Sequence, residues 1–319
     1  MMNRCFRFLA LVLLPAAAFA GAGPMDTLVV VNGASRDSRA LGAYYAERHG
    51  LPPSHVCTIQ TDPRSPSISQ TFFEREIRQP IYDHLARNQL AGQIHFLVLC
   101  MDIPSRVENA NGITAALFYG YKLPAPDAPQ CNVAPESVNQ YYAAETAYSS
   151  SVGWNRTNAP IPFLLTASDL ATAKQVVDRA VASVGSLPAG VFCLYGSGDG
   201  ARNIRHRTYP VVARHFALFG KSDSIDVNPG ASPVPARPIL GYLTGLAYLP
   251  TNLVDATFVP GTIGDHLTSC AGQIPDPCLG QSSVWDWMRL GATASYGTVS
   301  EPCSFEVKFP DPMIAFWYS

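Results

Sequence analysis

The chain has 319 residues, of which 47% are hydrophobic and 14% charged, and its formal net charge is −2 at pH 7. This composition is typical of a globular protein and excludes a disordered or membrane-embedded chain. The nearly balanced charge provides no overall attraction for nucleic acid or anionic lipid, although local basic clusters remain possible, and we expect no nucleic-acid partner. The length suffices for a large hydrophobic core in one domain or two.

The first 20 residues have the pattern of a secretory signal peptide. A positively charged start and an apolar run from Phe8 to Ala17 precede Ala18-Phe19-Ala20, which has the small residues of a cleavage site. The apolar run is too short for a membrane span, and we predict none. We therefore expect an exported protein, periplasmic or extracellular, whose residues 21–319 form a single α/β domain.

The next part of the chain alternates between strand and helix patterns. Short apolar runs, typical of strands buried on both faces, lie at Thr27–Asn32, His55–Gln60 and Ile94–Cys100. Apolar residues at helical spacing predict one helix that ends at His49-Gly50 and a second helix over Phe72–Leu90. Pro80 should kink the second helix or start a new turn. This alternation predicts βαβ units and a parallel sheet with right-handed crossovers.

Residues 106–162 break the pattern, because they are rich in proline and serine. We expect a long irregular insertion there, with one short helix near residues 138–147. Loops of this length in compact domains are commonly functional or mobile.

Strand and helix patterns then resume. Strands are predicted at Phe163–Thr166, Gly190–Tyr195, Ser224–Val227, Ile239–Thr244, Thr262–Thr268 and Ala292–Val299, and helices at Leu170–Gly185, Tyr209–Phe219 and Val284–Leu290. The fold class predicted from the whole pattern is a three-layer α/β sandwich with a mainly parallel, doubly wound sheet.

The cysteines fall into two groups. Of the eight, Cys5 lies in the predicted signal peptide, and the remaining seven leave at least one thiol unpaired. Three lie in apolar runs, where inert buried thiols are usual: Cys57, Cys100 and Cys193. Four lie in loop-like sequence: Cys131, Cys270, Cys278 and Cys303. Export permits a disulfide, and we expect Cys278 to bridge either Cys270 or Cys303. No cysteine and histidine spacing of a zinc site occurs, so we predict no metal and no other cofactor.

Two loops are candidate ligand sites. Gly196-Ser197-Gly198-Asp199-Gly200 follows a predicted strand and precedes Arg202, so its amides could form an anion-binding nest, and a simple tight turn is the alternative. Asp102, with Arg106 and Glu108 nearby, follows the strand at Ile94–Cys100. Ligands of open parallel sheets bind beyond the carboxyl ends of strands, although a solvated loop is again the alternative.

His266 and Cys270 are the candidate catalytic pair, because a thiolate beside an imidazole makes a nucleophile and a base. Their separation of four residues would bring them together on a helix. On a strand, at about 3.3 Å per residue, their Cα atoms would lie roughly 13 Å apart. If the pair is active, Cys270 is the nucleophile, His266 the base, and Asp265 or Glu301 the acid that orients the base. The alternative is a structural histidine beside a disulfide-bonded or buried cysteine.

Several stretches resemble a family of exported bacterial proteins with no established activity. They are VVVNGASRDSRALGAYYAERHGLP, IHFLVLCMDIPSRV, PGTIGDHLTS and WDWMRLGATASYGTVSEPC followed by KFPDP, and together they span nearly the whole mature chain. The resemblance implies that chains of this family continue beyond the KFPDP region. A chain truncated at its C-terminus is therefore an alternative to a complete one.

The order of elements is also distantly similar to gingipain-like and caspase-like cysteine peptidases. That resemblance implies a fold of their type, with a flavodoxin-like sheet as the alternative, and places the catalytic Cys at Cys270. Leu246 stands at the position of the catalytic His, so His266 would have to act as the base. Two functions follow. One is a cysteine-peptidase-like hydrolase or its degenerate relative. The other is a non-catalytic envelope or extracellular protein that binds a small molecule or peptide, or contacts a surface, through the insertion and residues 196–207.

Overall fold

The computed structural model describes residues 23–122, 159–186 and 189–315. The predicted signal peptide and the helix expected near residues 138–147 lie outside these ranges. Among the described residues, no helix combines the length and the apolar character that a membrane crossing requires.

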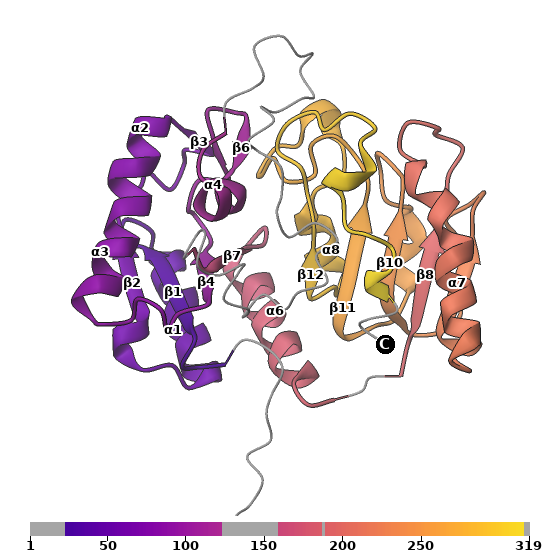
Figure 1. Cartoon of the computed structure of the whole chain (residues 1–319), viewed down its shortest axis with the longest axis horizontal. Coiled ribbons are helices and arrows are strands. Elements are labelled where there is room, and N and C mark those ends of the chain that lie inside the picture. Colours follow the sequence, from indigo (N-terminus) through magenta and orange to yellow (C-terminus); the bar gives the residue numbers. More distant parts are fainter. Residues whose placement is uncertain (1–22, 123–158, 187–188, 316–319) are drawn as a thin grey trace, which may run out of the picture.

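The first sheet has four parallel strands in the order β2-β1-β4-β7 (Figure 1). The strands are β1 (Thr27–Asn32), β2 (Val56–Ile59), β4 (Phe96–Cys100) and β7 (Ile161–Leu165). Alternate side chains of β1 enter two different cores, because successive residues of a strand point to opposite faces. This explains why the whole of β1 is buried and why its four central residues, Leu28–Val31, are all apolar.

Helices cover both faces of this sheet. Val29 and Val31 pack with α1 (Arg36–His49), whereas Leu28 and Val30 face the opposite helical layer. That layer consists of α2 (Gln70–Phe72), a π-helical segment (Phe73–Arg78), α3 (Gln79–Arg87) and α4 (Ile113–Tyr119). Pro80 lies in the first turn of α3, directly after the π-helical segment, where its missing N–H is tolerated.

A small sheet lies beyond the C-terminal ends of these strands. It consists of β3 (Ser67–Ile68), β5 (Arg106–Val107) and β6 (Asn111–Gly112), in the order β3-β5-β6. The prediction of an irregular insertion from Arg106 onward is therefore wrong at its start, because residues 106–119 form two strands and α4. Two-residue strands carry no periodic signal, which is why the sequence pattern missed them.

The second sheet has five parallel strands in the order β12-β11-β10-β8-β9. The strands are β8 (Val191–Tyr195), β9 (Ile225–Asn228), β10 (Ile239–Thr244), β11 (Phe258–His266) and β12 (Ala294–Ser295). The helix α7 (Tyr209–Leu218) packs on one face, and α8 (Val284–Leu290) and α6 (Leu170–Ser183) pack on the other. Short 3-10 turns complete the described chain: Pro53–His55, Ile204–Thr208, Ser222–Ser224, Thr251–Asp255, Cys278–Gly280 and Glu306–Lys308.

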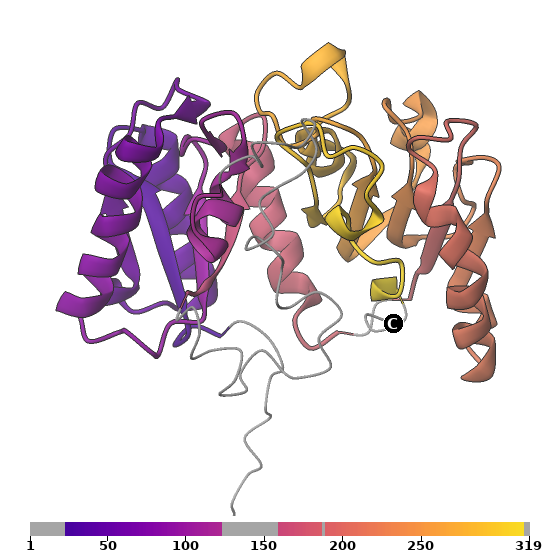
Figure 2. The ribbon, with the colours of Figure 1, turned by 45° about the horizontal axis from the view of Figure 1, so that its top comes forward.

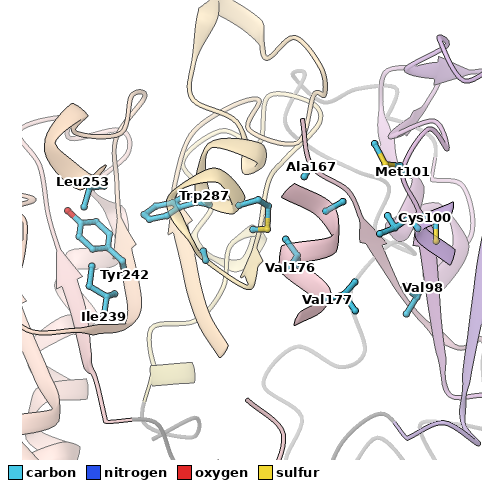
Figure 3. Packing of buried hydrophobic residues seen from close by; sticks show 14 of the residues in the cluster. Val98, Cys100, Met101, Ala167, Val176, Val177, Ile239, Tyr242, Leu253 and Trp287 are labelled. Carbon is cyan, nitrogen blue, oxygen red and sulfur yellow. The ribbon is translucent and has the colours of Figure 1, made fainter. Parts of the chain in front are cut away.

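The predicted fold class, an α/β sandwich of mainly parallel strands, is confirmed, but the strands are divided between two sheets. The helix α6 lies between the sheets in both orientations of the molecule, where it contacts α1, β11 and α8 (Figures 1 and 2). Its Val176 and Val177 belong to a core that also holds Cys100 of β4, Tyr242 of β10 and Trp287 of α8 (Figure 3). One continuous hydrophobic core therefore joins the two sheets.

Both sheets have a point at which the strand order reverses. In the first sheet, β2 and β4 lie on opposite sides of β1, and in the second sheet, β9 and β10 lie on opposite sides of β8. Ligands of open α/β sheets bind beyond the carboxyl ends of the strands at such a switch point. The chain therefore offers two places for a site, one at the C-terminal end of each sheet.

Candidate functional site at the C-terminal end of the second sheet

The loops that follow β8 and β10 are tied to each other. Ser197 donates a hydrogen bond from its hydroxyl to the carbonyl oxygen of Gly245, at 2.6 Å. A Cβ atom at Gly245 would lie only 2.0 Å from the carbonyl oxygen of Arg202, so glycine is required for this close approach. The Gly-rich loop predicted as a ligand site is thus held firmly at the switch point of the second sheet.

The anion position predicted within this loop is filled by the loop itself. Asp199 Oδ1 accepts hydrogen bonds from the backbone N–H groups of Ala201 and Arg202, at 3.0 and 3.2 Å. Partial burial opposes ionisation of this carboxyl, but the hydrogen bonds and charge of Arg202 outweigh burial, so the pKa of Asp199 is lowered. The loop therefore carries its own carboxylate where a bound anion would lie.

Arg202 connects this loop to the end of β11. Its Nη1 forms an ion pair with Asp199 Oδ2 at 2.5 Å, and its Nε donates to Thr268 Oγ1 at 3.1 Å. Thr268 in turn donates to Gln281 Oε1 at 2.8 Å. The Asp199 and Arg202 side chains remain partly exposed, so this end of the sheet presents an acceptor and a donor side by side.

His266, the predicted base, is fully buried with both ring nitrogens occupied. Trp287 donates from Nε1 to His266 Nδ1 at 2.9 Å, which leaves Nε2 to donate to the carbonyl oxygen of Ser282, also at 2.9 Å. Burial lowers the pKa of His266, so the ring stays neutral. The imidazole links β11, α8 and the segment before α8, and it has no free nitrogen with which to accept a proton.

Cys270, the predicted nucleophile, forms a disulfide with Cys278. A cysteine in a disulfide cannot form a thiolate, so the expected pair of Cys270 and His266 is not formed in this structure. The alternative stated for these residues, a structural histidine beside a bridged cysteine, describes their geometry. Of the two pairings expected for Cys278, the structure has the one with Cys270, and Cys303 takes part in another disulfide.

The two acids considered as partners of His266 do not contact it. Asp265 precedes His266 on β11, so the two side chains point to opposite faces of the sheet. Asp265 Oδ2 instead lies 2.6 Å from Nη2 of Arg205, and both side chains are buried. Glu301 is exposed and accepts a hydrogen bond from the backbone N–H of Cys303 at 2.8 Å. Neither acid can orient the imidazole.

The ion pair of Arg205 and Asp265 is a feature that the sequence did not reveal. Arg205 donates to the carbonyl oxygens of Thr244 and Pro310, at 2.9 and 3.2 Å, and so ties the end of β10 to the C-terminal segment. The contact with Asp265 is close but poorly aligned, because neither carboxylate oxygen has a hydrogen bond of good geometry. In sequence, Arg205 belongs to a basic cluster that gives no sign of burial.

Asp102 lies at the switch point of the first sheet, as its position after the strand predicted. Its backbone is left-handed, with φ 62°, and its Oδ2 accepts a hydrogen bond from the hydroxyl of Ser35 at 2.5 Å. The side-chain amide of Asn32 donates to the carbonyl oxygens of Asp102 and Thr61, at 2.7 and 3.1 Å. These contacts join the ends of β1, β2 and β4, so Asp102 holds the first switch point together.

Comparison with protein-family models, with curated proteins and with solved structures finds no match. What the site can do chemically is therefore inferred from its geometry. Among the described residues, no three His, Cys, Asp or Glu side chains gather closely enough to hold a metal ion. Among the described residues at the end of the second sheet, no cysteine thiolate lies beside a base. Asp199 and Arg202 form a polar, partly exposed surface there.

The three free thiols of the described chain should not react in the folded protein. Cys57, Cys100 and Cys193 are all buried, and burial raises the pKa of each thiol. For Cys57 and Cys193 the pKa rises to about 12. We expect mass spectrometry to find iodoacetamide on these residues only after unfolding in guanidinium chloride. Rapid labelling of any of them in the native state would contradict this expectation.

Proposed function

We propose that this is an exported, non-catalytic protein, a degenerate relative of cysteine peptidases that binds peptides at the C-terminal end of its second sheet. The observation that supports the proposal most is the bridge between Cys270 and Cys278, at the position that the peptidase resemblance assigns to the nucleophile. A cysteine peptidase needs a thiolate within reach of a base. Here the sulfur is bonded, His266 has no free nitrogen, and Leu246 cannot accept a proton.

Export is supported by the state of the cysteines. Cys270, Cys278 and Cys303 are all disulfide-bonded, which is typical of proteins in oxidising compartments and rare in the cytosol. This agrees with the signal-peptide pattern in the sequence. We accordingly propose a periplasmic or extracellular location.

Peptides fit the geometry of this surface and the resemblance to peptidases. Asp199 and Arg202 offer an acceptor and a donor at the switch point, and Thr268 fixes the guanidinium of Arg202. Main-chain amides of a peptide carry both donors and acceptors, so a peptide can satisfy both side chains. The analogy is that a peptidase which has lost its chemistry can keep its peptide-binding surface.

The absence of catalysis is tested by hydrolysis assays. We expect the mature protein to leave a mixed set of fluorogenic peptides intact, with or without a mild thiol reductant, and Cys270→Ser to behave identically. The reductant matters because it opens the disulfide and frees Cys270. Turnover that appears on reduction and disappears in both Cys270→Ser and His266→Ala would establish the peptidase instead.

Peptide binding is tested by fluorescence anisotropy with three fluorescein-labelled short peptides, one acidic, one basic and one neutral. The double variant Asp199→Ala with Arg202→Ala should weaken binding about tenfold or more, because each lost charged hydrogen bond contributes roughly that factor. Arg207→Ala is the matched control, since Arg207 lies nearby but is exposed and paired with Glu306. Failure of all three peptides to bind, or an equal loss in the control, would contradict the proposal.

A further inference from the structure

Arg106, on β5, has charged donors that no described residue satisfies. Its Nε and Nη1 atoms are inaccessible to solvent and have no hydrogen-bond partner. None of the ion pairs between described residues includes it. Buried charged donors without partners are costly and uncommon in native proteins, so a group outside the chain is the natural partner. The residue as a whole is partly exposed, which leaves a route for such a group.

The acids nearest to Arg106 in the sequence are engaged elsewhere. Glu108 accepts a hydrogen bond from the backbone N–H of Gln70 at 2.8 Å, at the start of α2. Asp102 accepts from the hydroxyl of Ser35. The fold therefore brings a cation to the C-terminal end of the first sheet and directs the neighbouring carboxylates to other partners.

The backbone around Arg106 is held firmly in the small sheet. The N–H groups of Ser105 and Arg106 both donate to the carbonyl oxygen of Pro66, at 3.1 and 3.3 Å, and the N–H of Ile113 donates to the carbonyl oxygen of Ser105 at 2.9 Å. β5 is the central strand, with β3 on one side and β6 on the other. A side chain on such a backbone is presented to a ligand in a prearranged position.

The register of the small sheet places Arg106 at the junction between the two halves of the molecule. Arg106 lies opposite Gly112 in the antiparallel pair of β5 and β6, and opposed residues share one face of a sheet. A Cβ atom at Gly112 would lie 3.8 Å from the methyl groups of Val299, which follows β12 of the second sheet. Figure 1 shows β6 near the loops above β12. Arg106 therefore lies on the face that meets the second half.

We propose that Arg106 binds an anionic group of a ligand, a carboxylate or a phosphate, at the junction between the C-terminal ends of the two sheets. A guanidinium group matches both anions, because its planar N–H groups can donate in parallel to two oxygens. The proposal rests on other residues than Asp199 and Arg202, so it stands whether or not those two residues bind peptides.

The test measures the melting temperature of the mature protein in sodium phosphate, sodium acetate and sodium chloride at equal ionic strength. An anion that binds the folded state raises the melting temperature in a saturable way. We expect phosphate, acetate or both to do so beyond chloride, and Arg106→Gln to weaken that binding about tenfold or more. Arg106→Lys should keep part of the effect, because it retains the charge. The relative response to the two anions distinguishes a phosphate from a carboxylate.

Arg64→Gln is the control, because the Arg64 side chain is 90% exposed and pairs only with Asp62 among the described residues. The control should respond to the anions as the wild type does. If Arg106→Gln fails to fold, titration of arginine side-chain N–H resonances in the wild type, assigned with Arg106→Lys, replaces it. A wild type that responds to neither anion beyond chloride, or an equal response in Arg106→Gln, would overturn the proposal and leave water as the partner of Arg106.

Discussion

Replacement of Arg205 by methionine should lower the free energy of unfolding by about 3–5 kcal/mol, as expected when one partner of a buried ion pair is removed. Asp265 is 0% exposed and Arg205 1% exposed, so the variant would leave a carboxylate in the protein interior without a cation. It would also remove the hydrogen bonds that join Thr244 to Pro310 through Arg205. Urea unfolding with intact disulfides, monitored by circular dichroism, measures the change in the free energy of unfolding.

Two further variants make this expectation specific. Arg207→Met removes a neighbouring guanidinium whose side chain is 71% exposed and paired with Glu306, so it should cost less than about 1 kcal/mol. Arg205→Met combined with Asp265→Leu removes both buried charges and should regain most of the lost stability. If Arg205→Met destabilises the protein no more than Arg207→Met does, the buried pair is not the structural link described above.

Replacement of Trp287 by alanine should lower the free energy of unfolding by about 3–5 kcal/mol, as large cavities in a core do. Trp287 is fully buried, and its ring packs on Gly264 of β11 and beside Tyr242 of β10 at 5.5 Å between ring centroids. The cavity would open between α8 and the second sheet, within the core that joins the two halves. Urea unfolding again provides the measurement.

The hydrogen bond of Trp287 is tested separately by Trp287→Phe. This variant keeps an aromatic ring but leaves His266 Nδ1 without its donor, so it should cost about 1–3 kcal/mol. Trp285→Phe is the matched control, because Trp285 is only partly buried and donates to Thr166 Oγ1 at the edge of the first sheet. A larger loss in Trp285→Phe than in Trp287→Phe would contradict the bracing role of His266 and Trp287.

Most of the strands could be predicted because their signal is local. The runs at Thr27–Asn32, Ile94–Cys100, Gly190–Tyr195 and Ile239–Thr244 are short and apolar, and each corresponds to a buried strand. The division into two sheets could not be predicted, because it depends on where α6 packs. Contacts of α6 with α1 and β11, far apart in sequence, separate the two sets of strands.

The candidate catalytic pair of His266 and Cys270 was located by the sequence, but its chemical role was not. The sequence placed His266 and Cys270 at the end of a late strand, which is where they lie. It could not decide between a reactive pair and a structural one, because that depends on partners elsewhere in the chain. Trp287 and Ser282 take the two ring nitrogens, and Cys278 takes the sulfur.

The sequence by itself determined the strands of the two large sheets, most helices, the α/β class and the burial of the three free thiols, since these follow from apolar patterns within short windows. The tertiary structure alone decided that Asp265 pairs with Arg205 rather than with His266, and that buried donors of Arg106 find no partner among the described residues. Side-chain direction, burial and pairing arise from contacts between distant segments. Residue spacing along the chain does not contain that information.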